Sequence, residues 1–531
     1  MIGLDRPWVA FFLAALFAII WSCRLFNFYS PLSEYLLERP SDQQAERVFL
    51  QQASSVEFPT PIDYRPIQEL CTRTDFQPGL LFSCEGQHGG VGMVRNQILR
   101  CIRYAISGGG AIVVPSMALR NAKDLKDIET NNEVPLEYLF DREAFIGHLS
   151  KGCPQMKIYE NTEEFPFYER RMGESLNLIG SQFEPDHPVK GLRHPREWRR
   201  FFDEWLNEQS VEIRSNTPVH VKIGQSFLEY PVRDDGVAFA NEFGKILSFR
   251  NDTRVLAAKV LYELDQRFVL AMDPTKAINT GAYYGAHLRL EADAIWAWSP
   301  EEGWRFSRME DQFEEQFQNL ERTGLEVVYV ASGNDTVVDI FANELSKRLA
   351  GNSGSQKNVT VVTKHDLLQG SDWKWLDSLT FDQQALVDFL MMFKASTFMG
   401  VAHSSFPWNV ALRRHELSKY TKYANEGSDL LRDEYSVIMG MEADYPYVDP
   451  FVYGWIVQSS TQKKSKARRD LGLKILSVDM NREGKTTGWG WGGLERHTGL
   501  TVSLLAVVRH SISEHKQWLE EDEHSALIGG N

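Results

Sequence analysis

Short apolar runs alternate with amphipathic stretches through the second half of the chain, and this alternation constrains the fold more than any other feature. The runs are rich in β-branched residues and predict strands at 283–288, 325–331, 358–363 and 397–402. The stretches between them predict helices near 309–321, 336–349 and 381–394, and one that begins near Ser405. Apolar strands that alternate with helices are typical of a parallel sheet covered on both faces. We therefore expect a Rossmann-like lobe over residues 270–440.

The first half contains the beginning of a second unit of the same kind. Residues 79–84 predict a strand, and a glycine-bearing turn follows it. Apolar residues then recur at helical spacing from Val94 to Ala105, glycines at 108–110 end that helix, and 111–115 predict the next strand. These are the first elements of a parallel lobe, which we place at 76–269. The expected fold class is α/β, with two Rossmann-like lobes that face one another across a cleft.

The N-terminal segment predicts a membrane anchor. Trp8 to Cys23 carries no charge, and extension to Phe28 adds one arginine and reaches the roughly 20 residues that cross a bilayer. A cleaved signal peptide is the alternative, but the cleavage pattern after the segment is poor. We expect a cytosolic tip and transmembrane anchor at 1–28 and a proline-punctuated stem at 29–75. Residues 441–531 form a C-terminal extension to which no role is assigned.

Composition limits the kinds of partner. The 531 residues include 57 Lys and Arg against 72 Asp and Glu, so the formal net charge is -15. A field of that sign repels phosphate backbones, and we therefore expect no nucleic-acid partner. Hydrophobic residues make up 43% of the chain, which is enough for several packed cores and argues against general disorder.

Cysteines and glycosylation motifs bear on the compartment. Four of the five cysteines fall in the first half of the folded body: Cys71, Cys84, Cys101 and Cys153. An even number is compatible with two disulfides, and buried free thiols are the alternative. No Cys-x-x-Cys pair occurs, which disfavours a zinc site. Three Asn-x-Ser/Thr motifs would accept glycans if the body lies in the secretory lumen, at Asn251, Asn334 and Asn358.

Polar side chains follow each predicted strand of the second lobe. They are His287, Arg289, Glu291 and Asp293 after the first strand, Ser332 to Asp335 after the second, Lys364 to Asp366 after the third, and His403 to Ser405 after the fourth. In open α/β sheets, ligands bind beyond the carboxyl ends of the strands. These residues therefore predict one rim for a polar, phosphorylated ligand. Ordinary loop polarity is the alternative.

Arg289 is the strongest single candidate for a phosphate-binding residue. A guanidinium at a strand end is a planar fork that can bind two phosphate oxygens at once. The alternative is a structural ion pair with Glu291 or Asp293.

Three further residues are candidates for ligand binding, and each also has an ordinary structural explanation: Ser404, Ser405 and His287. The two serines open a predicted helix, where hydroxyls and free backbone N–H groups can bind an anion, although an ordinary helix cap has the same sequence. His287 lies on an apolar strand, where a buried core histidine is the commoner case.

A glycine-rich turn joins the first predicted strand to its helix. Gly89, Gly90 and Gly92 would let the backbone approach a ligand closely, and Arg95 and Asn96 follow at the helix start. The turn is not a phosphate-binding P-loop, since Met and Val stand where Lys-Ser/Thr is required. It is not a dinucleotide fingerprint either, because no acidic residue ends the next strand. Kinases, sulfotransferases and dehydrogenases are therefore disfavoured.

Three separated blocks together resemble the GDP-fucose O-fucosyltransferase superfamily, including its plant and fungal branches. HGGVGMVRNQILRCIRYAISGGGAIVVP, His88 to Pro115, is similar to the glycine-rich first block of the family. GAHLRLEADA, Gly285 to Ala294, resembles its His-x-Arg block. FMGVAHSSFPWNVALRRH, Phe398 to His415, resembles its Ser-Ser-Phe block. The similarity covers roughly residues 80–415.

The resemblance implies a GT-B fold in which the second lobe binds GDP-fucose, and inversion at the anomeric carbon without an essential metal or other cofactor. The matching positions imply that Arg289 holds the diphosphate and that Asp293 and His287 shape the guanosine site. They imply that Ser404, Ser405 and Phe406 line the nucleotide pocket. Glu85 is the first candidate for the base that takes the acceptor proton and His88 the second. A carboxylate that caps the next helix is the structural alternative for Glu85.

The family is lumenal in the secretory pathway, so the resemblance implies a single-pass type II protein of the Golgi or endoplasmic reticulum membrane. The acceptor is expected to be a protein or a glycan. One rival is a transferase that uses another sugar nucleotide, or one that binds a metal through Glu291 and Asp293. The other rival is an inactive, membrane-anchored relative that binds a glycan or a protein.

Overall fold

The computed structural model describes residues 40–440 of the chain apart from short segments. Those segments are 122–123, 126–131, 172, 179–182, 184–191, 193, 225–234, 298–303, 352–357, 421–422 and 427–428. No helix among the described residues is both long and apolar enough to span a membrane. The anchor expected at 1–28 and the extension expected at 441–531 lie outside the described residues.

The first lobe is built on a five-stranded sheet in the order β5-β2-β1-β7-β6, and every neighbouring pair is parallel. β1 (Leu80–Glu85) lies at the centre of the sheet. It is buried on both faces, because Leu80 and Phe82 pack into the main core while Leu81 packs with Phe165 on the other side. The other strands are β2 (Ala111–Val113), β5 (Ile158–Tyr159), β6 (Leu176–Leu178) and β7 (Val219–Gly224).

Glycines and disulfides hold the first strand and helix together. α5 (Val91–Gly108) ends at Gly109, which has a φ of 69°. A Cβ there would lie 2.0 Å from the carbonyl oxygen of Asp75, so only glycine fits. The disulfide Cys84–Cys101 joins β1 to α5, and Cys71–Cys153 joins α4 (Arg65–Arg73) to the end of α6 (Arg142–Gly152). Of the two alternatives that the sequence left open for these cysteines, the structure has the two disulfides.

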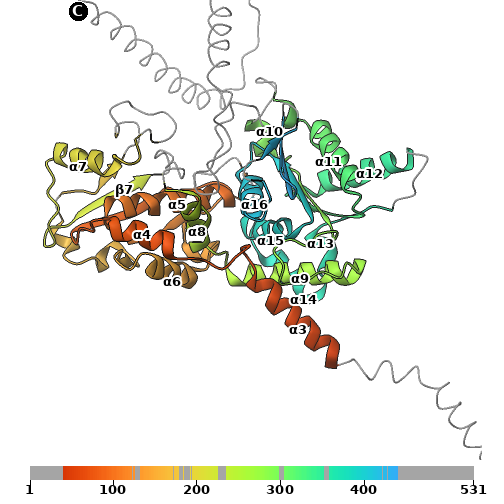
Figure 1. The fold of residues 1–531 in the computed structure, drawn as a ribbon, viewed down its shortest axis with the longest axis horizontal. Helices are drawn as coiled ribbons and strands as arrows, with labels where there is room; N and C mark the ends of the chain where they lie inside the picture. The colour runs from red at the N-terminus through yellow and green to blue at the C-terminus, as the bar shows by residue number, and fades with distance from the viewer. Residues whose placement is uncertain are drawn as a thin grey trace, which may run out of the picture. The chain divides into compact units, whose positions relative to one another are not determined.

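The second lobe contains a seven-stranded sheet in the order β10-β9-β8-β11-β14-β13-β12. The first five strands are parallel and the last two form an antiparallel edge. The strands are β8 (Tyr284–His287), β9 (Val327–Ala331), β10 (Thr360–Val362), β11 (Thr397–Val401), β12 (Ala424–Asn425), β13 (Leu430–Arg432) and β14 (Ser436–Met439). Figure 1 shows this sheet between its helices. The α/β class with parallel sheets is confirmed.

Helices of the second lobe begin and end close to their predicted positions. The principal ones are α11 (Met309–Thr323), α12 (Asp335–Gly351), α15 (Phe381–Lys394) and α16 (Ser405–His415). α15 starts where predicted because Thr380 and Gln383 form a capping box, in which each side chain bonds the other residue's backbone N–H. Shorter helices are α10 (Ala292–Ala297), α13 (Lys364–Leu367) and α14 (Gly370–Ser378).

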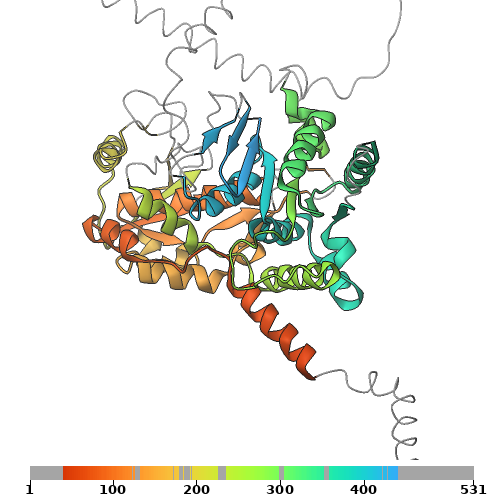
Figure 2. The ribbon, with the colours of Figure 1, turned by 45° about the vertical axis from the view of Figure 1, so that its right-hand side comes forward.

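The expected stem is wrong for residues 40–73, which fold onto the body. α3 (Pro40–Ser55) packs against α9 (Asn251–Phe268) and is seen beside it in Figures 1 and 2. Ile67 of α4 is fully buried. The prolines do not indicate a linker here. Pro66 occupies the first turn of α4, where the missing N–H is tolerated.

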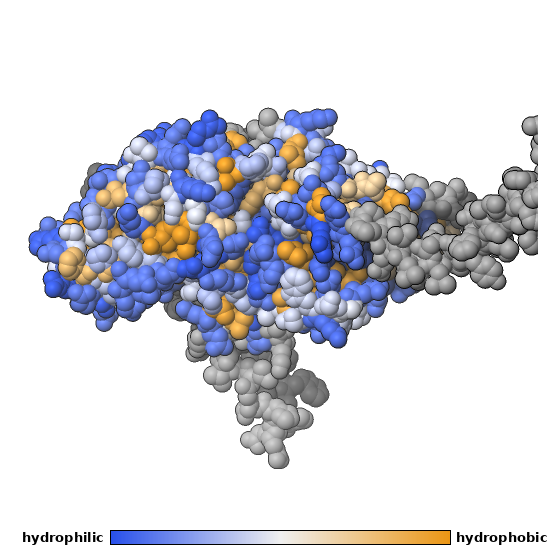
Figure 3. Space-filling view, turned by 90° about the horizontal axis from the view of Figure 1, so that it is seen from below, coloured by the Kyte–Doolittle hydropathy of each residue, from blue (hydrophilic) through white to orange (hydrophobic). Residues whose placement is uncertain are grey.

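The two sheets share one apolar core, which includes Ile98 of α5, Leu386 of α15 and Trp408 of α16. α5 packs against α16 at this junction (Figure 1). A Cβ on Gly92 would lie 2.7 Å from Oγ of Ser405, so a glycine is needed for this approach. On the face seen in Figure 3 the surface is mainly hydrophilic, with hydrophobic residues in small separate groups.

Candidate active site

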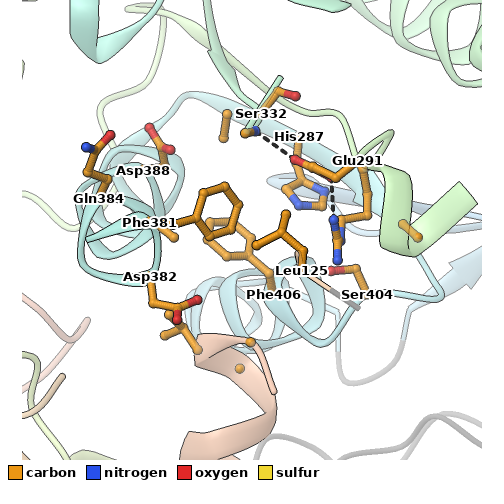
Figure 4. A pocket seen from close by; sticks show the side chains of 18 of the residues that line it. Leu125, His287, Glu291, Ser332, Phe381, Asp382, Gln384, Asp388, Ser404 and Phe406 are labelled. Atoms are coloured by element: carbon orange, nitrogen blue, oxygen red, sulfur yellow. Dashed lines mark hydrogen bonds and ion pairs between the residues drawn. The ribbon is translucent and has the colours of Figure 1, made fainter. Parts of the chain in front are cut away.

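Residues of both lobes enclose a cavity of about 540 Å³. The first lobe contributes the glycine turn and two residues that follow β3 (Ser116–Ala118), namely Gly89, Gly90, Val91, Gly92, Met93, Arg120 and Leu125. The second lobe contributes the residues that follow β8, β9, β10 and β11, together with the first turns of α15 (Figure 4). The rim predicted from the strand ends is therefore present, because parallel strands end at one edge of their sheet.

Arg289 lies in the cavity wall and also makes the ion pairs named as its alternative. Its guanidinium donates to Glu291 and, at 3.0 and 2.6 Å, to both carboxylate oxygens of Asp293. Burial disfavours its charge, but these carboxylates outweigh that effect and raise the pKa of Arg289. Buried Gln312 of α11 fixes the loop, since its side chain bonds both the N–H and the C=O of Arg289 at 3.2 Å. The cation is thus preorganised and remains charged.

His287 and Phe406 form one aromatic wall of the cavity. Their rings stack at 4.9 Å with an interplanar angle of 11°, and Figure 4 shows Phe381 close to them. Burial and the charge of Arg289 lower the pKa of His287 to about 3, so the imidazole is neutral at physiological pH. Its buried Nδ1 has no hydrogen-bond partner among the described residues. His287 is therefore both a buried histidine and a neutral polar group at the site.

Ser404 and Ser405 line the same cavity at the start of α16. Both are buried, and Ser404 occupies the N-cap position without a side-chain cap hydrogen bond. The ordinary helix-cap alternative is not realised, since the hydroxyl does not bond the helix backbone. Free N–H groups and two hydroxyls at this helix start are suited to an anion.

Four residues predicted at the site, Glu85, His88, Arg95 and Asn96, do not line this cavity. Arg95 donates to Oδ1 of Asn409 and to the carbonyl of Gly244, both at 2.8 Å, and so fastens the two lobes. Asn96 is buried in the same helix, and the backbone N–H of His88 is bound by Gln97. Glu85 accepts from Ser83 and lies 3.7 Å from Lys222. Arg95 and Asn96 are buried within α5, which packs against α16, whereas Glu85 and His88 precede that helix.

Several cavity residues were missed by sequence reasoning. Arg120 is in a stretch without strand or helix periodicity, and Phe381 and Asp382 open α15 rather than follow a strand. Burial raises the pKa of Asp382 to about 6, against the opposing effect of Arg120. Asp388 accepts from Tyr329 at 2.8 Å and from Lys364 at 2.7 Å. The capping-box residues at the start of α15 were the only signal in the sequence near Phe381 and Asp382.

The charge of the lining is mixed. Arg120, Arg289 and Lys364 stand against Glu291, Asp293, Asp335, Asp382 and Asp388. Among the described residues no cluster of three or more His, Cys, Asp or Glu side chains is arranged to hold a metal ion.

A sequence model of the GDP-fucose protein O-fucosyltransferase family matches residues 80–417. The chain belongs to this family. The matched region begins at the first residue of β1 and ends just after α16, so it contains both sheets and the cavity. As a member of the O-fucosyltransferase family the protein is a glycosyltransferase. A comparison with curated protein sequences gave no significant match.

Solved structures of fucosyltransferases are similar to the chain at low identity. POFUT1 in complex with GDP-fucose is 14% identical with a TM-score of 0.40, over 69% of this chain and 100% of that one. A mutant of Arabidopsis thaliana FUT1 in complex with GDP is 14% identical with a TM-score of 0.32, over 66% and 71%. The fucosyltransferase NodZ from Bradyrhizobium is 11% identical with a TM-score of 0.30, over 63% and 92%.

Proposed function

We propose that this O-fucosyltransferase family member transfers fucose from GDP-fucose to a hydroxyl group of a protein or glycan acceptor, with inversion, in a GT-B arrangement of its two lobes. One observation carries the proposal: the guanidinium of Arg289 and the hydroxyls of Ser404 and Ser405 line one cavity. Its volume of about 540 Å³ is within the range typical of small-molecule sites.

Leaving-group stabilisation is the main catalytic contribution in this proposal. When the bond from fucose C1 to the diphosphate oxygen breaks, negative charge grows on the departing GDP. Arg289 and the N–H groups at the start of α16 are fixed before the reaction and can stabilise that charge without reorganisation. His287 stays neutral and adds hydrogen bonding rather than charge.

Glu85 remains the candidate base for the acceptor hydroxyl. Its carboxylate does not line the donor cavity, but it is 40% exposed and ends the strand that leads into the glycine turn. A hydroxyl that reaches fucose from the face opposite GDP has to approach from outside the donor cavity. Glu85→Gln should then lower transfer to an acceptor more than it lowers hydrolysis of the donor by water.

We also infer that the body lies in the lumen of the secretory pathway. The disulfides Cys71–Cys153 and Cys84–Cys101 favour an oxidising compartment. Of the three glycosylation motifs, Asn251 and Asn358 are exposed, whereas the side chain of Asn334 accepts from the N–H of Val337 at the start of α12. Type II membrane anchoring by residues 1–28 accompanies this inference.

Thermal stabilisation by sugar nucleotides tests the donor. GDP-fucose and GDP should raise the melting temperature of the purified full-length chain more than UDP and UDP-sugars do. Release of fucose from GDP-fucose should be unaffected by millimolar EDTA. Stabilisation by UDP-sugars alone, or activity that EDTA abolishes and manganese restores, contradicts the proposal.

A further inference from the structure

Arg120 brings a second guanidinium from the first lobe into the cavity wall. It lies two residues beyond β3, its side chain is only 7% exposed, and it lines the cavity together with Arg289 of the second lobe. Its Nη1 atom lies 3.9 Å from the point that a Cβ on Gly90 would occupy. The guanidinium therefore lies beside the glycine turn, where the two lobes meet.

A single carboxylate oxygen joins the two guanidiniums. Nη2 of Arg120 and Nη2 of Arg289 each donate to Oδ2 of Asp293 at 2.6 Å. Phosphate and carboxylate oxygens accept from the same planar fork. Two guanidiniums that share one anionic oxygen therefore lie close enough together to act on a single diphosphate.

An ion pair that only fastens the lobes does not account for all of the contacts of Arg120. Its Nη1 lies 3.7 Å from Oδ1 of Asp382, which is too long for a hydrogen bond. Nη2 donates to Asp293 and to the carbonyl of Leu125, whereas the buried Nε has no partner. The buried Nε atoms of Arg254 and Arg413 also have no partner among the described residues, so Nη1, which lies near the glycine turn, is the informative group of Arg120. Arg120 thus keeps donor capacity on the side that faces the glycine turn.

The charges around the cavity make a second cation necessary for a diphosphate. Lys364 is bound to Asp388 at 2.7 Å, and Arg289 is shared between Glu291 and Asp293. A diphosphate brings further negative charge into a partly buried space, where repulsion from carboxylates is strong. Arg289 alone cannot compensate it while it remains paired. Arg120 makes one hydrogen bond to a carboxylate, and its Nη1 lies beyond hydrogen-bond distance of Asp382.

We propose that Arg120 is a donor-binding residue that holds a phosphate oxygen of the GDP-sugar from the first lobe, opposite Arg289. Before the donor enters, Arg120 is held by Asp293 and, at longer range, by Asp382; on entry the phosphate oxygen takes the place of Asp382. This inference rests on the proposed function and adds to it a ligand from the other lobe. The bound diphosphate then contacts both lobes.

The inference predicts that Arg120 affects ligands with a β-phosphate more than ligands without one. In this proposal the oxygen that Arg120 holds belongs to the β-phosphate, so Arg120 should contribute to the binding of GDP and GDP-fucose and much less to the binding of GMP. Calorimetric titration of the purified full-length chain with GDP and with GMP measures this difference. The variants are Arg120→Ala, Arg120→Lys and Asp382→Asn. Arg199→Ala is the control, because Arg199 is an arginine of the same lobe whose guanidinium bonds Asp203 and which does not line the cavity.

We expect Arg120→Ala to weaken GDP binding about tenfold or more, as for a lost hydrogen bond between charged groups. GMP binding should change by less than about threefold, and Arg120→Lys should lie between the variant and the wild type. Asp382→Asn should tighten GDP binding, because the competing carboxylate is removed. Arg199→Ala should leave both affinities unchanged. If Arg120→Ala does not fold, Arg120→Lys and Asp382→Asn carry the same test.

Two outcomes overturn the inference. One is an unchanged GDP affinity in folded Arg120→Ala, and the other is an equal loss for GDP and GMP, which would make Arg120 a structural latch. Both leave the proposed function intact as long as the wild-type chain binds GDP and hydrolyses GDP-fucose. A wild-type chain that does not bind GDP contradicts the proposed function itself, and this inference falls with it.

Discussion

Two arginine sites of the second lobe, Arg414 at the end of α16 and Arg289 beyond β8, are held in opposite ways. Arg414 is fully buried, and its guanidinium donates to neutral acceptors only: the carbonyls of Met392, Phe393, Ala395, Ser396 and Tyr435 and the hydroxyl of Ser436. Burial lowers its pKa to about 10. Arg289 is held by carboxylates at the wall of a cavity.

The difference separates a structural cation from one that can exchange partners. Arg414 satisfies carbonyls at the end of α15, which have no partner within the helix, and no other group can replace it there. Arg289 is bound to anions, and another anion of similar shape can replace them. A buried arginine is therefore informative about function only when its partners are known.

Arg414→Ala should give the largest effect, and it acts on stability. Several buried carbonyls lose their donor at once, and each unsatisfied buried group costs about 1–3 kcal/mol, so we expect a loss of more than about 3 kcal/mol in the free energy of unfolding. Denaturant titration measures it. Arg414→Lys is the matched control and should lose less, because it keeps the charge. A loss below about 1 kcal/mol in Arg414→Ala would remove the contrast with Arg289.

Arg289→Ala should act on turnover instead. We expect kcat/KM for GDP-fucose to fall by the equivalent of about 2–4 kcal/mol, the scale for loss of a donor to a charge that develops in the transition state. Arg289→Lys should be intermediate, since the ammonium keeps the charge but not the fork. Circular dichroism and a melting curve establish that the variants are folded. Turnover within twofold of the wild type in folded Arg289→Ala contradicts the enzymatic role.

Gly92→Ala, compared with a control glycine, should distinguish two effects on stability: the loss of the close contact between the lobes and the ordinary gain in helix propensity. Its Cβ would lie 2.7 to 2.9 Å from Ser405 atoms, so we expect a loss of about 1–3 kcal/mol in stability and weaker GDP binding. Gly147→Ala is the matched control. Nothing lies within 4 Å of its Cβ position in α6, and alanine should stabilise the helix there by about 0.5–1 kcal/mol. Equal effects of the two changes, measured by denaturant titration, would refute the close approach at Gly92.

Asp382→Asn should have an effect on stability whose size depends on pH. Burial raises the pKa of Asp382 to about 6 in the folded chain from an ordinary value of 3.8. Its contribution to stability is therefore complete below pH 4 and is lost as the pH rises through 6. Near pH 7.5 the variant should be more stable than the wild type by at most about 3 kcal/mol, and near pH 4 the two should converge. A difference that does not change between pH 4 and 7.5 contradicts the raised pKa.

Local patterns were sufficient for the elements and for the rim of the site. Strands β8 to β11 and helices α11, α12, α15 and α16 form where apolar periodicity predicts them. The polar residues after β8 and β11 then meet, because parallel strands bring their carboxyl ends to one edge. Residues 40–73 show where local patterns fail. Their prolines indicate a linker, but Ile67 and the disulfide of Cys71 bind them to the body.

What the sequence by itself determined is the class of fold and the group of strand-end residues that contains Arg289 and Ser404, since both follow from periodicity over a few residues. Only the tertiary structure decided which polar side chains share the cavity. Glu85 and Arg95 turn away from it, although they adjoin the glycine turn. Arg120 reaches it by bonding a carboxylate 173 positions further along the chain. Such a contact depends on how two lobes pack, and no short-range spacing in the sequence encodes that.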